Sequence, residues 1–251
     1  MKKWMSKFLN RLSDAIFPNN ITCVVCGEEL SYDVKYYVCD NCIDQFDFLV
    51  GKTCAKCGAR VTADTVYCSD CQYVKHVVDC NYSALVYTGK VKQMIHALKY
   101  DGKKHLAVSL GKMLNDLYCD VVKGYEPDIV IPIPLNSVRL RTRGYNQTEL
   151  MLTEVDGIDD KIATDVVVRI KDTPHQASLP KKDRRENVKG AFEVTRPECV
   201  KDKNILIVDD IFTTGATIDE CADVLYKAGA KLVRSMTLCN SHQDNALEDS
   251  E

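Results

Sequence analysis

The most distinctive chemical feature of this 251-residue chain is its set of 13 cysteines. Eight of them form four Cys-x-x-Cys pairs, separated by 12, 11 and 10 residues: Cys23/Cys26, Cys39/Cys42, Cys54/Cys57 and Cys68/Cys71. The two-residue gap lets both thiolates of a pair reach one metal ion, and the loop lets a second pair complete a tetrahedron. Soft sulfur ligands in a closed tetrahedron favour zinc. The spacing therefore predicts two structural zinc sites, with no open coordination position for catalysis.

Iron–sulfur and redox chemistry fit the cysteine spacing less well than zinc does. Iron–sulfur clusters also take four cysteines but usually at other spacings, and a redox Cys-x-x-Cys explains one pair rather than four. The ligands could be grouped in sequence order or cross-braced, and we favour sequence order. The odd total argues against a closed disulfide framework. Because ~50 residues hold little apolar core, the metal would supply most of the folding free energy of this segment.

The second chemical feature is the run ILIVDDIFTTGAT at residues 205–217. A buried strand would deliver two adjacent carboxylates, Asp209 and Asp210, ahead of a turn of small residues that opens a helix. The turn can direct backbone N–H groups and hydroxyls at a phosphate, helped by the helix N-terminus. Paired acids beside a phosphate make sense if they bind sugar hydroxyls and help to hold Mg²⁺. A simple helix cap would explain the threonines and glycine but not the aspartates, and no Gly-Lys-Ser/Thr of a Walker A loop follows.

Alternating strand and helix patterns begin after residue 80 and must position these carboxylates. Strands are expected at Tyr82–Thr88, Asp128–Ile133, Asn204–Val208 and Lys231–Cys239, with a weaker one at Asp165–Ile170. Apolar residues at helical spacing occupy 91–98, 106–117 and 218–228. Short apolar runs are typical of parallel strands buried on both faces. The pattern predicts an α/β fold with a doubly wound parallel sheet, which binds ligands at the carboxyl ends of its strands.

The chain is expected to contain four parts. They are an amphipathic helix at 1–20, a zinc domain at 21–78, the α/β domain at 79–240 and an acidic, disordered tail at 241–251. Charged residues interrupt the first apolar stretch, which excludes a signal peptide, and no run approaches the ~20 apolar residues of a membrane span. We therefore expect a cytoplasmic protein whose first helix packs on the protein itself rather than on a membrane or a partner. The net charge of −3 excludes a uniformly basic nucleic-acid coat.

Taken in order, these motifs resemble the ComF family, competence-associated proteins in which a cysteine-rich zinc domain precedes a phosphoribosyltransferase-like domain. The run VDDIFTTGAT is similar to the phosphoribosyl-diphosphate (PRPP) signature of type I phosphoribosyltransferases. The other matching segments are the IFP before Cys23, the cysteine pairs, YTGKVKQMIHALKYDGKKHLA, IPIPLNSVRLRTRGYNQTEL and QASLPKKDRRENVKGAF. The resemblance implies a type I phosphoribosyltransferase-like parallel sheet with helices on both faces, preceded by a small double zinc-ribbon domain.

The resemblance also implies roles for individual residues. Asp209 and Asp210 would bind the ribose hydroxyls, and the 5′-phosphate would be bound by Thr213, Thr214, Gly215, Ala216 and Thr217. The Pro132–Asn146 loop would be the pyrophosphate loop, with positive charge from Arg139, Arg141 and Arg143. The basic segment Arg169–Lys189 would be a hood loop that closes over the reaction, with Gln176 and Arg184 matching the family pattern. Asp209, Asp210, Arg143 and Arg184 are thus the predicted catalytic residues.

The function implied by the resemblance is PRPP binding and Mg²⁺-dependent phosphoribosyl transfer, in the uptake and processing of transforming DNA. Oxopurine salvage enzymes typically carry an aspartate where this chain has Thr213, which argues against hypoxanthine or guanine as acceptor. The alternative is a non-catalytic PRPP sensor or a DNA-binding adaptor, with single-stranded DNA and the family's competence helicase as partners. The Lys90–Lys104 stretch, with five lysines against one aspartate, is a candidate for DNA contact.

Overall fold

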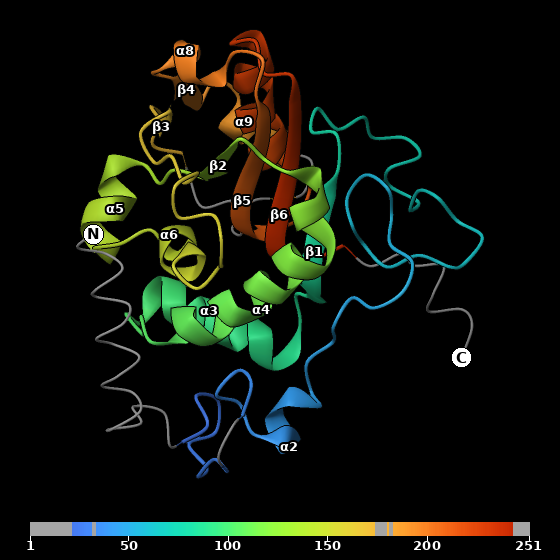
Figure 1. The fold of residues 1–251 in the computed structure, drawn as a ribbon, viewed down its shortest axis with the longest axis vertical. Helices are drawn as coiled ribbons and strands as arrows, with labels where there is room; N and C mark the ends of the chain where they lie inside the picture. The colour runs from blue at the N-terminus through green and yellow to red at the C-terminus, as the bar shows by residue number, and fades with distance from the viewer. Residues whose placement is uncertain (1–21, 32–33, 174–179, 181–182, 243–251) are drawn as a thin grey trace. The chain divides into compact units, whose positions relative to one another are not determined.

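The computed structural model describes residues 22–31, 34–173, 180 and 183–242 (Figure 1). The expected N-terminal helix, Gln176 and the acidic tail beyond His242 lie outside these residues. The chain divides into two compact units, residues 1–45 and 46–251. The division falls between the second and third cysteine pairs, so each unit carries one half of the zinc-ribbon segment. Within the described ranges, no helix has the length and apolar character needed to cross a membrane.

The described part of the first unit is a small cysteine-centred knuckle. A tight turn follows Cys23, whose carbonyl accepts from the Gly27 amide at 2.8 Å, and the Cys23 amide donates back to Glu28 at 2.7 Å. Gly27 has φ +80°, a left-handed conformation in which a side chain would be strained. The short helix α2 (Asp40–Ile43) carries the last cysteine of this unit. So little regular structure is consistent with a fold that depends on bound metal.

The second unit is built on a parallel four-stranded sheet in the order β1-β6-β5-β2 (Figure 1). These strands are β1 (Asn81–Val86), β2 (Ile129–Pro132), β5 (Asn204–Phe212) and β6 (Leu232–Asn240). The run Ile205–Val208 in β5 is fully buried, although alternate side chains of a strand point to opposite faces. Both faces of the sheet are therefore covered, as the short apolar runs predicted.

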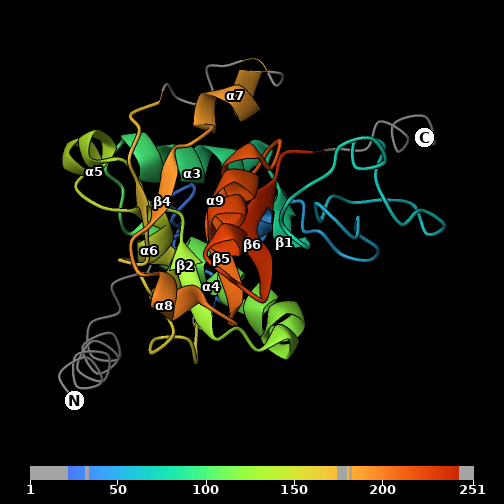
Figure 2. The ribbon, with the colours of Figure 1, turned by 90° about the horizontal axis from the view of Figure 1, so that it is seen from above.

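Helices lie on both faces of this sheet. Helix α9 (Ala216–Lys227) packs on the face that carries Ile205 and Ile207. Helices α4 (Leu106–Leu117) and α6 (Gln147–Leu152) contact β1, β6 and β5, and cover the opposite face (Figure 2). Helix α3 (Gly89–Tyr100) follows β1 and contacts α4. The predicted fold class, a phosphoribosyltransferase-like parallel sheet between two layers of helices, is confirmed.

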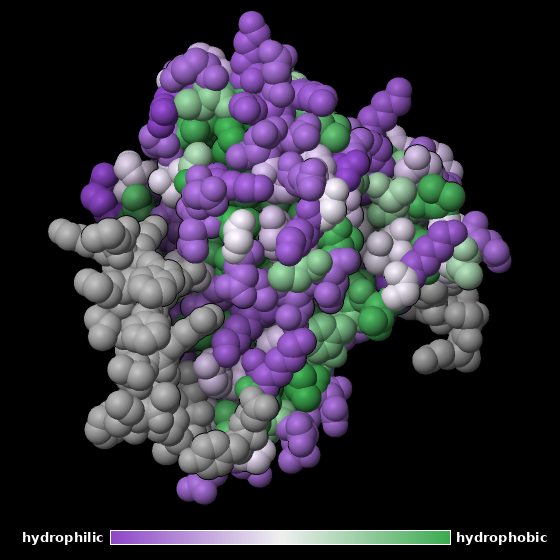
Figure 3. All heavy atoms as spheres, in the orientation of Figure 1, coloured by the Kyte–Doolittle hydropathy of each residue, from purple (hydrophilic) through white to green (hydrophobic). Residues whose placement is uncertain are grey.

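Shorter elements complete the unit. They are α5 (Ser137–Arg143), α7 (Arg184–Val188), α8 (Pro197–Val200), a π-helical turn at Tyr118–Val122 and a 3₁₀ turn at Lys123–Tyr125. Strands β3 (Val167–Arg169) and β4 (Phe192–Val194) pair antiparallel in a separate small sheet. Hydrophilic side chains cover most of the face seen in Figure 3, with apolar residues in small groups between them. The apolar strands are thus enclosed by the helices rather than exposed.

Two local expectations from the sequence differ from the structure. The strand expected to end at Val208 continues to Phe212, because residues 209–212 pair with Thr237–Asn240 of β6. The paired acids therefore lie within a strand and not in the turn after it. The segment expected as a loop, Pro132–Asn146, contains α5, whose first turn is capped by the Asn136 side chain accepting from the Arg139 amide at 2.7 Å.

Both edges of the main sheet carry further backbone pairing. Beside β1, the Leu49 amide donates to the Ala84 carbonyl and the Val86 amide to the Asp47 carbonyl, each at 2.8 Å. Beside β2, Val130 donates to Lys161 and accepts from Ala163, each at 2.9 Å. Neither covering segment is itself a strand of the sheet.

The second half of the zinc-ribbon segment belongs to the sheet's own core. Cys54, Cys57 and Cys68 are buried in one apolar cluster with Ile218 and Cys221 of α9. The Cys57 carbonyl accepts from the side chains of Asn81 and Asn240, at 3.0 and 2.6 Å. A side chain at Gly58 would lie 2.6 Å from the Asn81 carbonyl oxygen, so the ribbon backbone lies directly against β1. This ribbon is therefore an integral part of the second unit.

Candidate functional site

The eight paired cysteines form two separate clusters. Each cluster brings four sulfur atoms within 4.8 Å of one another, the first from Cys23, Cys26, Cys39 and Cys42 and the second from Cys54, Cys57, Cys68 and Cys71. The grouping in sequence order is thus confirmed over the cross-braced one. In each cluster a backbone amide donates to sulfur at 3.3 Å, from Cys39 to Cys23 and from Cys68 to Cys54. Four sulfurs with amide donors fit a closed tetrahedral zinc site.

The predicted carboxylate pair lies at the carboxyl end of β5. Asp210 is buried, and its Oδ2 atom contacts Lys99 Nζ at 2.6 Å and accepts from Gln147 Nε2 at 3.0 Å. Asp209 accepts from the Asp210 amide at 2.8 Å, and among the described residues it forms no ion pair. Burial and the neighbouring charge of Asp210 raise the pKa of Asp209 to about 7. The two acids therefore differ in their environment, although they are adjacent in sequence.

Lys99 supplies the positive charge beside this pair. Burial alone would lower its pKa, but the charges of Asp210 and Asp209 outweigh burial and raise the pKa above its ordinary value. The sequence prediction placed Lys99 among the five lysines available to DNA, whereas the structure directs it into the site. It lies one helical turn after the buried Ile95 of α3, and this spacing was the available signal.

The turn from Thr213 to Thr217 connects the carboxylates to the N-terminus of α9. Gly215 caps the helix with φ +70°, and a side chain there would lie 2.6 Å from the Phe212 ring. The Thr214 hydroxyl oxygen is buried and has no hydrogen-bond partner among the described residues. A buried hydroxyl without a partner is unfavourable unless a ligand satisfies it. The turn and the helix N-terminus thus have the composition of an anion site.

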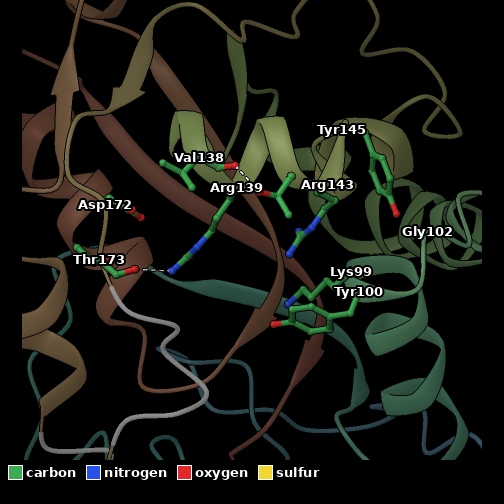
Figure 4. Close-up of a pocket in the computed structure, with 10 residues that line it drawn as sticks. Lys99, Tyr100, Gly102, Val138, Arg139, Arg143, Tyr145, Asp172 and Thr173 are labelled. Atoms are coloured by element: carbon green, nitrogen blue, oxygen red, sulfur yellow. Dashed lines mark hydrogen bonds between the residues drawn. The ribbon is translucent and has the colours of Figure 1, made fainter.

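A cavity of about 650 Å³ opens beside Lys99 (Figure 4). Its lining residues are Lys99, Tyr100, Gly102, Val138, Arg139, Thr142, Arg143, Tyr145, Asp172 and Thr173. In Figure 4 the side chain of Arg143 extends from α5 toward Lys99 and Tyr100, whereas that of Arg139 extends toward Thr173. Three cations against one aspartate make this cavity suited to an anionic ligand.

Arg143 is linked to the carboxylate pair through one intermediate side chain. It donates to Gln147, which in turn donates to Asp210. The Arg143 guanidinium also lies 5.6 Å from the centre of the Tyr100 ring, a cation–π distance. No motif of the sequence indicates Gln147, because its role depends on the start of α6 lying beside β5.

The other predicted arginines differ in burial and in their contacts. Arg139 donates to the Thr173 carbonyl at 2.5 Å, and burial lowers its pKa. Arg141 is exposed, and Arg184 begins α7. Arg169, which sequence analysis did not select, donates to the Thr173 hydroxyl at 2.5 Å. Burial and the charge of Arg139 lower the pKa of Arg169 to about 10, which indicates two guanidinium groups crowded near the carboxylates.

Comparisons with known proteins match both halves of the chain. Residues 103–251 match the phosphoribosyl transferase domain, and residues 12–72 match the double zinc ribbon domain. Competence protein F of Haemophilus influenzae is 27% identical over 221 residues, which cover 86% of this chain and 95% of that protein. Competence protein ComFC of Bacillus subtilis is 26% identical, covering 89% and 96%. DNA utilization protein YhgH of Escherichia coli O6:H1 is 29% identical, covering 75% and 84%.

Proposed function

Because this chain belongs to the phosphoribosyl transferase domain family and, like the ComF proteins it resembles, carries a double zinc ribbon, we propose that it binds PRPP with Mg²⁺ and transfers the phosphoribosyl group. The observation that carries the proposal is the carboxylate pair of the partly buried Asp209 and the buried Asp210, which shortly precedes a turn with an unsatisfied hydroxyl and a helix N-terminus. This arrangement offers acceptors for ribose hydroxyls and donors for a phosphate within one short segment.

The carboxylates have the donor chemistry for Mg²⁺. Hard carboxylate oxygens are the protein ligands that Mg²⁺ accepts, usually together with phosphate oxygens of a substrate. A bound Mg²⁺ would supply positive charge to the diphosphate leaving group. Because its pKa is about 7, Asp209 is protonated in a fraction of the molecules at neutral pH. Binding of a cation, or of a hydroxyl group that donates to the carboxylate, would favour loss of this proton. Asp210 stays oriented by Lys99 and Gln147.

The cationic cavity beside Lys99, which pairs with Asp210, supports a position for the diphosphate. Arg139, Arg143 and Lys99 would neutralise the leaving diphosphate as the bond to the anomeric carbon breaks. Positive charge develops on the sugar in such a displacement, and the carboxylates would stabilise it. Closure of the Arg169–Lys189 segment, with Arg184 as a catalytic residue, would exclude water.

A calorimetric titration of PRPP, with and without Mg²⁺, tests binding. We expect saturable, Mg²⁺-dependent binding that is lost when Asp209 and Asp210 are both replaced by Asn. The matched control is Asp223→Asn, further along α9, where the partly exposed carboxylate forms an ion pair with Lys227. No saturable binding by the native protein would refute the proposal. Release of pyrophosphate on addition of DNA, nucleobases or amines would then separate an enzyme from a PRPP sensor.

We further propose that the protein acts in DNA uptake and processing, which is supported by the names of its relatives, two competence proteins and a DNA utilization protein. A cytoplasmic location is part of this proposal and comes from the sequence prediction. Direct DNA contact is the alternative function from the sequence. Lys92, Lys103 and Lys104 are exposed and Lys90 is partly exposed, whereas Lys99 is engaged in the site. Neutralising the four available lysines should abolish a salt-dependent shift of single-stranded DNA and leave PRPP binding unchanged. A shift that persists would place DNA elsewhere.

A further inference from the structure

A buried carboxylate in the first turn of α9 belongs neither to the aspartate pair nor to the cationic cavity. Asp219 is only 3% exposed. Its Oδ1 atom accepts from the Val77 amide at 2.9 Å, and its Oδ2 atom contacts His76 Nδ1 at 2.9 Å. Both partners belong to the segment that leaves the second zinc ribbon, five residues and more after Cys71. A carboxylate near a helix N-terminus is favourable even in water, so its burial against this segment needs a separate reason.

The same histidine lies against the proposed phosphate turn. The His76 side chain is 4% exposed and meets the Phe212 ring edge-on, with 5.5 Å between ring centres. A side chain at Gly215 would lie 2.7 Å from His76 Cε1, so the ring is in direct contact with the backbone of the turn. The Gly215 carbonyl accepts from the Asp219 amide at 2.7 Å, which closes the first turn of α9. His76, Gly215 and Asp219 thus form one contiguous group.

Helix α7 supplies a third contact to the same carboxylate, and it belongs to the Arg169–Lys189 segment that the sequence predicted as a hood loop. Arg185 of α7 forms an ion pair with Asp219 at 3.0 Å. A cavity of about 270 Å³ lies beside these contacts, lined in part by Thr213, Thr214, His76 and Arg185. The zinc ribbon, the hood segment and the phosphate turn therefore meet at one buried group. All of these residues belong to the unit 46–251.

We propose that the second zinc ribbon is a structural part of the phosphate site. Asp219 ties the ribbon's exit segment, His76–Val78, to the first turn of α9, and His76 holds the Thr213–Thr217 turn in its phosphate-receiving conformation. The inference rests on the proposed function of that turn. Asp219 and His76 are positioning residues, because they act through the turn and not on the substrate. Folding of the second ribbon is thereby coupled to PRPP binding, and the coupling is reciprocal.

The test combines hydrogen exchange with PRPP titration on the full chain. In Asp219→Asn, one oxygen can still accept from the Val77 amide, but the other is replaced by an NH2 group that faces His76 and Arg185, so the ion pair with Arg185 is lost and the contact with His76 is weakened. We expect amides 213–217 to exchange faster and the affinity for PRPP to fall by about tenfold or more. Zinc content should stay unchanged. His76→Leu should have the same two effects, whereas His76→Gln keeps a donor and should restore much of the affinity. Asp223→Asn, one turn further along α9, is the matched control and should change neither readout.

The outcomes separate this inference from the proposed function. If the native protein does not bind PRPP, the proposed function fails, yet the exchange of amides 213–217 still tests the tie. If Asp219→Asn and His76→Leu both show native exchange in this turn, the inference is wrong, whatever the affinity. If Asp219→Asn does not fold, the inference is tested by comparing the amide exchange and the PRPP affinity of His76→Leu with those of His76→Gln. A loss of affinity with both His76 variants alike would also overturn the inference.

Discussion

The two adjacent aspartates should respond in opposite directions to the same substitution. At pH 8, Asp209→Asn should stabilise the folded protein, and Asp210→Asn should destabilise it. Ionised Asp209 is unfavourable in the folded state, because burial and the charge of Asp210 raise its pKa from 3.8 to about 7. Ionised Asp210 instead pairs with Lys99 at 2.6 Å and accepts from Gln147. Asn at position 209 keeps an oxygen for the Asp210 amide.

The magnitude follows from the pKa of Asp209. Between about pH 4 and about pH 7 the folded protein binds this proton more tightly than the unfolded chain, so native stability falls as the pH rises through that window. The full difference corresponds to about 4 kcal/mol, and partial exposure of Asp209 to water reduces the expected gain to about 1–3 kcal/mol. Removing the partner of a buried cation costs about 3–5 kcal/mol of folding stability. In Asp210→Asn the charge of Asp209 still acts on Lys99, so we expect a loss near the lower end of this range.

Denaturant unfolding at a series of pH values measures both effects. The gain from Asp209→Asn should be present at pH 8 and should vanish as the pH approaches 4. The native protein without ligand is the reference, because bound PRPP or Mg²⁺ would favour the ionised carboxylates. A destabilised Asp209→Asn at pH 8, or a difference that does not depend on pH, would refute the electrostatic reasoning. Equal effects of the two substitutions would do the same.

Three further predictions concern the scaffold around the site. Cys71→Ser and Cys26→Ser should each remove one of two zinc equivalents, but only Cys71→Ser should destabilise the unit with the sheet, by ~2 kcal/mol or more in calorimetry with metal analysis. Gly215→Ala should cost about 1–3 kcal/mol and abolish PRPP binding, because φ is +70° and the new methyl group would meet Phe212; native affinity would contradict this. Tyr125→Phe removes a hydroxyl that donates to the carbonyls of Ile205 and Leu232, so it should cost about 1 kcal/mol in denaturant unfolding without changing PRPP affinity.

Features that depend on spacing along the chain could be predicted from the sequence. The cysteine pairs predicted both the metal clusters and their grouping, because a two-residue gap and a short loop limit which thiols can meet. The apolar run before Asp209 predicted a buried strand and placed the acids at its carboxyl end. The predicted end of this strand at Val208 was wrong. The strand continues to Phe212 because residues 209–212 pair with β6, and the register between the two strands cannot be read from the sequence.

Features that depend on segments meeting in space could not be predicted. The helical spacing from the buried Ile95 indicates that Lys99 faces inward, but only the fold shows that it meets Asp210 of β5. Gln147 and Asp219 are ordinary polar residues of helices until the fold places them beside β5 and the zinc ribbon. The positions of such groups depend on tertiary packing, which one sequence without its fold does not specify.

The covered edges of the sheet limit how copies of this protein can associate. A free edge strand exposes a row of backbone donors and acceptors that can pair with another chain. Here the Asp47–Leu49 segment occupies the outer side of β1, and Lys161 and Ala163 occupy that of β2, where Pro132 also lacks an amide hydrogen. Extension of the sheet from one molecule into the next is therefore blocked on both sides of the described structure. Contacts of the main sheet with another copy therefore rely on the side chains of its covering helices and segments, where charge and shape rather than backbone pairing along β1 or β2 determine which partner fits.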